Sequence, residues 1–158
     1  MTTERFSDIP IRSNGEDIDA GWFNTIRLLL VQIFGDIAGE SSQSIGDADT
    51  DQHVTAVSDI SCEEFSRVDI ECSIRRVDSL SNVFQTINLT LLYKGATLGW
   101  VIHGTDGPIT GDDALISFDI FEQTVLTFKE VTLTYSTTAL GGTGHAATIV
   151  TRHKKWAI

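Results

Sequence analysis

Apolar and polar residues alternate along most of the chain after Val54. In the clearest stretch, Val68 to Ile74, apolar residues take every second position, with Asp69, Glu71 and Ser73 between them. Successive side chains of an extended strand point to opposite faces, so this spacing predicts a strand with one buried face and one solvated face.

The same alternation predicts several further short strands. Residues 87–93 and 98–102 read as a hairpin that turns at Gly95, with Leu98, Trp100 and Ile102 pointing the same way. Further strands are expected at 116–120, 129–135 and 147–156, with a turn at Glu122-Gln123 before the second of these. Roughly seven or eight strands with turn signals between them favour a mainly β fold, an antiparallel β-sandwich or jelly-roll-like domain over 54–158.

The pattern before residue 36 is helical instead. Asp17 or Asp19 can cap a helix that ends at Gly35. Its apolar residues cover most of the circumference, whereas a helix packed on one side of a domain needs only a stripe. It is either buried between the β domain and the arm's own extended segment, or buried between subunits, which we favour. The predicted docking residues are Trp22, Phe23, Ile26, Leu29, Leu30, Ile33 and Phe34.

Three regions follow from these patterns. Residues 1–35 form an N-terminal docking arm, in which Pro10 favours an extended segment ahead of the apolar α-helix. Residues 36–53 are polar and rich in glycine, serine and aspartate, which predicts a linker. Residues 54–158 form the β domain.

Charge narrows the classes of partner. The formal net charge is −11, with 22 acidic and 11 basic residues, so binding to nucleic acid is not expected. The basic cluster at 152–155 is short, and we interpret it as the solvated edge of a terminal strand. Residues 1–10 contain no apolar stretch, and the apolar run 26–34 is interrupted by Arg27 and Gln32. We therefore expect neither a signal peptide nor membrane insertion, and synthesis in the cytoplasm.

Side chains that could carry chemistry are scattered. Cys62 and Cys72 are read as free buried thiols, with a cross-strand disulfide as the alternative. The Asp47-x-Asp49-x-Asp51 pattern resembles the start of a calcium loop, but its later ligand positions are missing, so a solvated acidic linker is the better interpretation. The four histidines lack metal-binding spacing, and no catalytic motif is present. We expect no enzyme activity, no cofactor and no metal.

The N-terminal arm resembles a known class of protein. The sequences FSDIPIRSNGEDI at 6–18 and AGWFNTIR at 20–27 look like the opening of small virion proteins of tailed bacteriophages. In those proteins an extended arm and an apolar helix precede a compact β domain. The resemblance implies a tail, fibre, collar or head-decoration protein on the outside of the particle, made in the host cytoplasm. It also implies other virion proteins as partners and a homo-oligomer, with a trimer as one option.

Two functions therefore stand as hypotheses. The first is a structural virion protein that docks through its arm and helix and holds its β domain outward. The alternative is a capsid decoration protein or a carbohydrate-binding module for host-surface glycans. The predicted glycan contacts are Trp100, His103, Tyr135 and Trp156.

Overall fold

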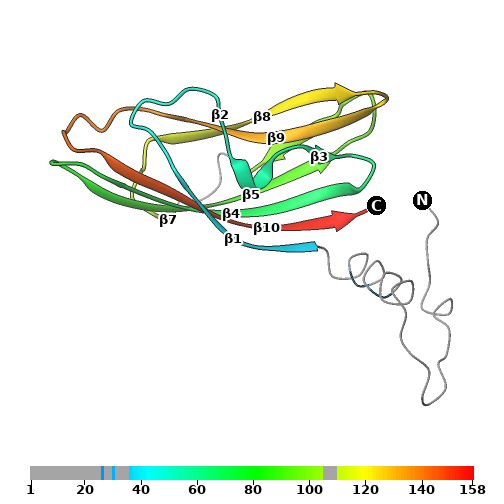
Figure 1. Ribbon diagram of the computed structural model, residues 1–158, viewed down its shortest axis with the longest axis horizontal. Helices are drawn as coiled ribbons and strands as arrows, with labels where there is room; N and C mark the ends of the chain where they lie inside the picture. The colour runs from blue at the N-terminus through cyan, green and yellow to red at the C-terminus, as the bar shows by residue number, and fades with distance from the viewer. Residues whose placement is uncertain (1–25, 27–29, 31–35, 105–109) are drawn as a thin grey trace, which may run out of the picture.

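The computed structural model describes residues 26, 30, 36–104 and 110–158 of the 158-residue chain. Two antiparallel sheets lie face to face in these residues (Figure 1), so the mainly β fold is confirmed. The larger, sheet A, has the strand order β1-β10-β4-β5-β6, with β7 also paired to β5. Its strands are β1 (Asp36–Ser44), β10 (Ala146–Ala157), β4 (Phe65–Val77), β5 (Asn82–Tyr93), β6 (Trp100–His103) and β7 (Thr110–Gly111).

The smaller sheet B is built around one central strand. This strand, β9 (Phe128–Thr137), pairs along its length with β8 (Ile116–Val125). Its other edge pairs with two short strands, β2 (Gln52–His53) and β3 (Ile60–Ser61), which a 3-10 helix at Thr55–Val57 connects.

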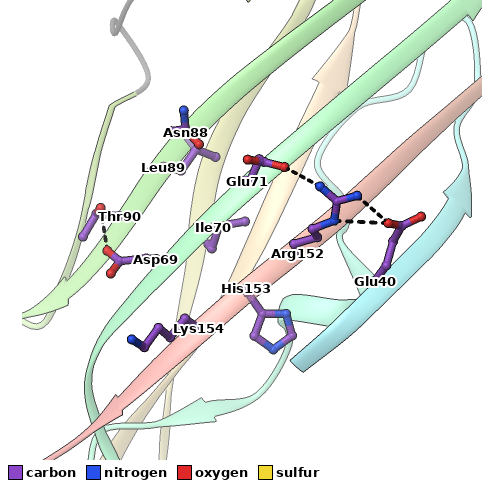
Figure 2. A pocket seen from close by; sticks show the side chains of 10 residues that line it. All are labelled: Glu40, Asp69, Ile70, Glu71, Asn88, Leu89, Thr90, Arg152, His153 and Lys154. Atoms are coloured by element: carbon purple, nitrogen blue, oxygen red, sulfur yellow. Dashed lines mark hydrogen bonds and ion pairs between the residues drawn. The ribbon is translucent and has the colours of Figure 1, made fainter. Parts of the chain in front are cut away.

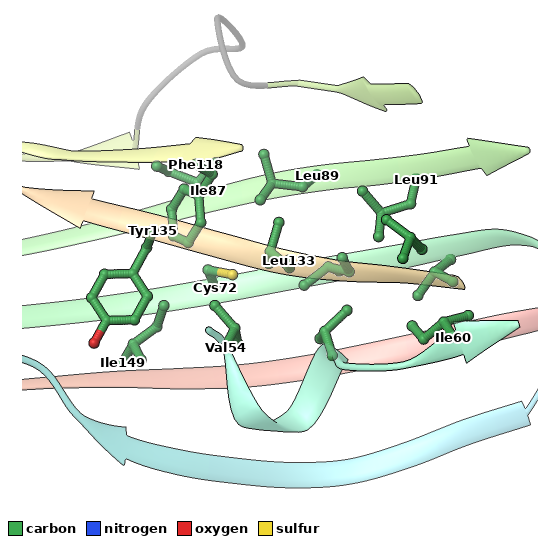
Figure 3. Close-up of a cluster of buried hydrophobic side chains, with 14 of the residues drawn as sticks. Val54, Ile60, Cys72, Ile87, Leu89, Leu91, Phe118, Leu133, Tyr135 and Ile149 are labelled. Atoms are coloured by element: carbon green, nitrogen blue, oxygen red, sulfur yellow. The ribbon is translucent and has the colours of Figure 1, made fainter. Parts of the chain in front are cut away.

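The core lies between the two sheets, where the alternation places it (Figure 3). Val68, Ile70, Cys72 and Ile74 of β4 are all buried, and the residues between them face outward. Both cysteines are buried and free, as the sequence predicted. Burial, and to a smaller degree the charge of Glu71, raise the pKa of Cys72 to about 12.

One predicted turn is wrong. The β5–β6 hairpin and the final strand are where the alternation placed them, but β8 passes through Glu122-Gln123 and continues to Val125. Glu122 takes an inward position in β8, and its carboxylate accepts hydrogen bonds from the Trp100 backbone N–H (2.6 Å) and Lys129 Nζ (2.7 Å). A charged residue that sequence alone reads as a turn signal is thus held inside the strand by two partners.

The stretch 36–53 is not a linker. Residues 36–44 form β1, which pairs with β10 from Asp36↔Lys155 to Ser44↔Thr148, with a register shift between Ala38 and Ser41. An edge strand needs backbone partners but few apolar side chains, and Ser42 and Ser44 are exposed. Residues 36–44 therefore lack the alternation of apolar and polar residues that would reveal a strand.

The predicted acidic linker is also not freely solvated. Asp47 accepts hydrogen bonds from Arg76 and from the Leu140 N–H, both at 3.0 Å. Asp49 accepts from the Gly46 N–H (2.5 Å) and from the Tyr135 hydroxyl (3.1 Å). These carboxylates fasten the loop after β1 to the sandwich. Among the described residues, no group of three or more His, Cys, Asp or Glu side chains could hold a metal ion.

The N-terminal arm lies almost wholly outside the described residues. Of the predicted helix, only Ile26 and Leu30 are described, and both have helical backbone. The arm and the helix thus remain a prediction. In the part of the chain that is described, no helix has the length and apolar character needed to span a bilayer.

The sandwich has two distinct ends. We call the end where β1 begins and β10 finishes the proximal end; there Asp36 pairs with Lys155, so residues 1–35 join the domain beside its C-terminus (Figure 1). We call the opposite end the distal end, where loops near residues 47, 114 and 138 meet around Arg76. Arg76 is fully buried, and its guanidinium donates to the backbone oxygens of Asp47, Ala114, Leu115 and Thr138 and to the carboxylate of Asp47.

Candidate functional site

The outer face of sheet A carries a groove of about 590 Å³ (Figure 2). Its outward side chains come from four neighbouring strands of the sheet, β1, β10, β4 and β5. The charged and polar residues that line it are Glu40, Asp69, Glu71, Asn88, Thr90, Arg152, His153 and Lys154.

An ion-pair triad fixes one side of the groove. Arg152 on β10 bonds Glu40 of β1 (2.7 and 3.1 Å) and Glu71 of β4 (3.0 Å), so one guanidinium bridges three adjacent strands. The hydrogen bonds and charge of Glu40, followed by those of Glu71, raise the pKa of Arg152. The triad ties the edge strand β1 to the sheet through side chains as well as through backbone.

A second cluster, centred on Asp69, borders the proximal end. Asp69 accepts hydrogen bonds from Arg67 Nε (2.8 Å), Trp156 Nε1 (2.8 Å) and the Thr90 hydroxyl (3.1 Å). Burial opposes ionisation of Asp69, but these three hydrogen bonds outweigh it and lower its pKa. Lys154 Nζ lies 3.7 Å from the centroid of the Trp156 ring, a cation–π contact.

The charges at the groove nearly cancel when Arg67, which pairs with Asp69 at its border, is included, although the protein is strongly acidic. Glu40, Asp69 and Glu71 face Arg67, Arg152 and Lys154, and most of these groups already bind one another. Such an arrangement links neighbouring strands of the sheet through their side chains.

The predicted glycan contacts do not come together. Trp100 and Tyr135 are only 4% and 3% exposed, because each lies on the core side of its strand. The Trp100 ring packs against Tyr93, and the Tyr135 hydroxyl donates to Asp49. Burial, followed by the interaction with Asp49, raises the pKa of Tyr135 to about 12. Neither ring can offer a face to a glycan.

The other two predicted glycan contacts do reach the surface. His103 is exposed on the outer face of sheet A, opposite Thr90 in register. Trp156 is half-buried at the groove's edge, held by Asp69 and covered by Lys154. Of the predicted docking residues, Ile26 and Leu30 are described and Leu30 is exposed, while the other five lie outside the described residues.

The basic cluster 152–155 is not on a strand edge. β10 lies between β1 and β4, His153 is buried, and Arg152 is ion-paired on both sides. The sequence does not reveal this, because β1, which lies beside β10, has the polar composition of a linker. The alternation with Ile70 and Cys72 does place Glu71 on the solvated face, but its partners depend on strand register.

Comparisons with known proteins give little further information. No protein-family model matches the chain, and no curated protein sequence is similar to it. Among solved structures, the tailspike protein of Acinetobacter baumannii phage AM24 is similar with a TM-score of 0.34 and 9% sequence identity. The alignment covers 77% of this chain and 26% of that one. This weak similarity is compatible with a phage structural protein, but it adds no argument for one.

Proposed function

We propose that the chain is a non-enzymatic structural protein of a tailed-phage virion, which docks through residues 1–35 and holds its β-sandwich outward. The observation that carries the proposal is the position of that segment. It joins the sandwich at the proximal end, where Asp36 pairs with Lys155, and the distal loops lie at the far end of the strands. The proximal end is thereby available for attachment, and the distal end can face away from the particle.

The proximal end has the side chains of a contact surface. Leu126, Leu98 and Ile158 are three of the four most exposed large apolar residues among those described. Leu126 lies in the β8–β9 turn, Leu98 in the β5–β6 turn, and Ile158 follows β10. Three cations, Arg67, Lys154 and Lys155, lie within 6 Å of the centroids of the Trp156 or Phe65 rings beside them. Apolar and cationic groups here complement the sequence of residues 1–35, in which Glu16, Asp17 and Asp19 precede or begin the predicted apolar helix.

The sequence of the arm supplies the second support, since 6–18 and 20–27 resemble the opening of small virion proteins of tailed phages. The partners proposed are other virion proteins and further copies of this chain. The location proposed is the outside of the particle.

Light scattering after size exclusion tests self-assembly of the full chain. The expected mass is a fixed multiple of 17.3 kDa. Trp22→Ala should lower that mass towards the monomer, because truncating a central aromatic of an interface costs ~2 kcal/mol or more. Gln32→Ala, at a polar position of the same predicted helix, is the matched control. A Trp22→Ala variant that assembles as the wild type does contradicts the docking role.

The virion assignment has its own test. Mass spectrometry of purified particles, from a phage that encodes the chain, should detect it in a constant ratio to the major capsid protein. Its absence from intact particles contradicts the assignment.

A carbohydrate-binding role is the second candidate function. The pocket on the outer face of sheet B that Asp51, His53, Asp119 and Phe121 line favours it.

A further inference from the structure

The outer face of sheet B contains a small pocket that is separate from the groove on sheet A. Its volume is about 270 Å³, and it is lined by Asp51, His53, Asp119, Phe121 and Thr134, with Ile120 beside them. Pockets for drug-sized ligands measure roughly 300–1,000 Å³, so this one suits a single ring.

Strand register builds the pocket. Thr134 lies on the central strand β9, with His53 of β2 opposite it on one side and Asp119 of β8 on the other. Its neighbours in sequence, Leu133 and Tyr135, are in the core, so Thr134 points outward. It is nevertheless only 5% exposed, and its hydroxyl has no hydrogen-bond partner among the described residues. The floor of the pocket therefore holds a hydroxyl on a mostly buried residue, and its oxygen is not among the buried side-chain atoms that lack a partner, so it stays open to a ligand.

Two rings form one wall. The His53 and Phe121 rings stack across β9, with centroids 5.9 Å apart and an interplanar angle of 27°. Phe121 is 48% exposed, although the stack fixes its orientation. It presents a flat apolar surface with negative charge density on its face, which attracts the weakly positive C–H groups of a saturated ring.

Two carboxylates stand beside these rings. Asp119 Oδ1 accepts the Ile120 N–H at 2.8 Å, and Asp51 Oδ1 accepts the Ser136 hydroxyl at 3.4 Å. For the second oxygen of each carboxylate, no donor is found among the described residues. Each can accept hydrogen bonds from hydroxyl groups of a ligand.

We propose that this pocket binds a neutral pyranose sugar, as the terminal residue of a glycan. The C–H face of a pyranose matches the Phe121 ring, its hydroxyls match the two carboxylates, and the Thr134 hydroxyl lies beneath. The proposal deepens the second candidate function and rests on it. It does not depend on docking through residues 1–35, which join the domain at the proximal end.

Saturation-transfer NMR on the full-length chain tests the proposal. The probes are the methyl pyranosides of glucose, galactose, mannose and N-acetylglucosamine, with propylammonium as a cation that the carboxylates alone could attract. At least one sugar should receive saturation at its ring C–H protons. Phe121→Ala and Asp119→Asn should each weaken its binding tenfold or more. Phe84→Ala, which removes a phenylalanine that is 52% exposed on sheet A, should leave binding unchanged.

Three results would overturn it. In the first, none of the four sugars receives saturation. In the second, only propylammonium does. In the third, Phe84→Ala and Phe121→Ala weaken sugar binding equally. Asp119→Asn preserves the size of the side chain, so it keeps the test decisive if Phe121→Ala fails to fold. Because Trp22→Ala addresses docking separately, failure of sugar binding and failure of assembly are distinguishable.

Discussion

Replacing Arg76 by methionine should remove much of the stability of the domain. The fully buried guanidinium donates to four backbone carbonyls and to one carboxylate oxygen, at distances from 2.6 to 3.2 Å. Methionine fills a similar volume but donates no hydrogen bond. It leaves Asp47 and the carbonyls of three loops without their shared partner.

The expected loss of unfolding free energy follows from the acceptors that lose the Arg76 guanidinium. A buried acceptor left without a donor costs ~1–3 kcal/mol, but loop carbonyls at the end of the sandwich can move towards water. Removing one partner of a fully buried charge pair typically costs ~3–5 kcal/mol. Asp47 is 31% exposed and keeps the Leu140 N–H, so we expect a loss of unfolding free energy of about 3 kcal/mol, at the lower end of that range. Domains have a total of about 5–15 kcal/mol, so the variant should be near its limit of stability.

Urea unfolding, followed by fluorescence, measures this loss as a fall in the midpoint at an unchanged slope. Arg75→Met is the matched control, because Arg75 is the preceding residue on β4 and is exposed on the outer face. It should change stability by no more than about 0.5 kcal/mol. An Arg76→Met variant within 1 kcal/mol of the wild type would refute the reasoning that Arg76 holds the distal loops together.

Two further predictions follow from titrating groups. The buried Cys72 thiol, whose pKa is raised to about 12, should react with a thiol reagent at pH 8 only at the rate of unfolding, and a fast reaction in native buffer would contradict its burial. The folded-state pKa of Asp69 is lowered, so its contribution to stability is present above the unfolded pKa near 3.8 and is lost as pH falls through the folded pKa. Asp69→Asn should therefore lower the melting temperature at pH 7 but not at pH 2. An equal fall in melting temperature at both pH values would contradict a lowered folded-state pKa of Asp69.

Some of the fold can be read from the sequence, and the reasons differ by element. Val68 to Ile74 reveal β4 because every second residue is apolar. Continuing that count by two reaches Arg76, so the alternation itself places an arginine in the core, although nothing in the sequence identifies its carbonyl partners. β1 gives no such signal, because an edge strand with serine on its outer face is recognisable only once β10 lies beside it.

The candidate sites were harder to predict for a related reason. Trp100 and Tyr135 are the kind of residue that binds glycans, but residue type does not say which sheet face a side chain takes. The pocket on sheet B joins residues of β2, β9 and β8 that are brought together only by register. Its one local signal is the alternation of Asp119 and Phe121 with Phe118 and Ile120, which places that pair on the outer face of a strand.

The pairing of β1 with β10 has a mechanical consequence. Suppose that residues 1–35 are held and that a force acts on the domain farther along the sandwich. The tension then lies along the axis of β1. Interstrand hydrogen bonds lie perpendicular to that axis, so the load is shared in shear by the whole ladder from Asp36 to Ser44. Traction across the sheet would instead open the same ladder one bond at a time. The proposed attachment through residues 1–35 would thus give the domain its greatest resistance to a force that acts along β1.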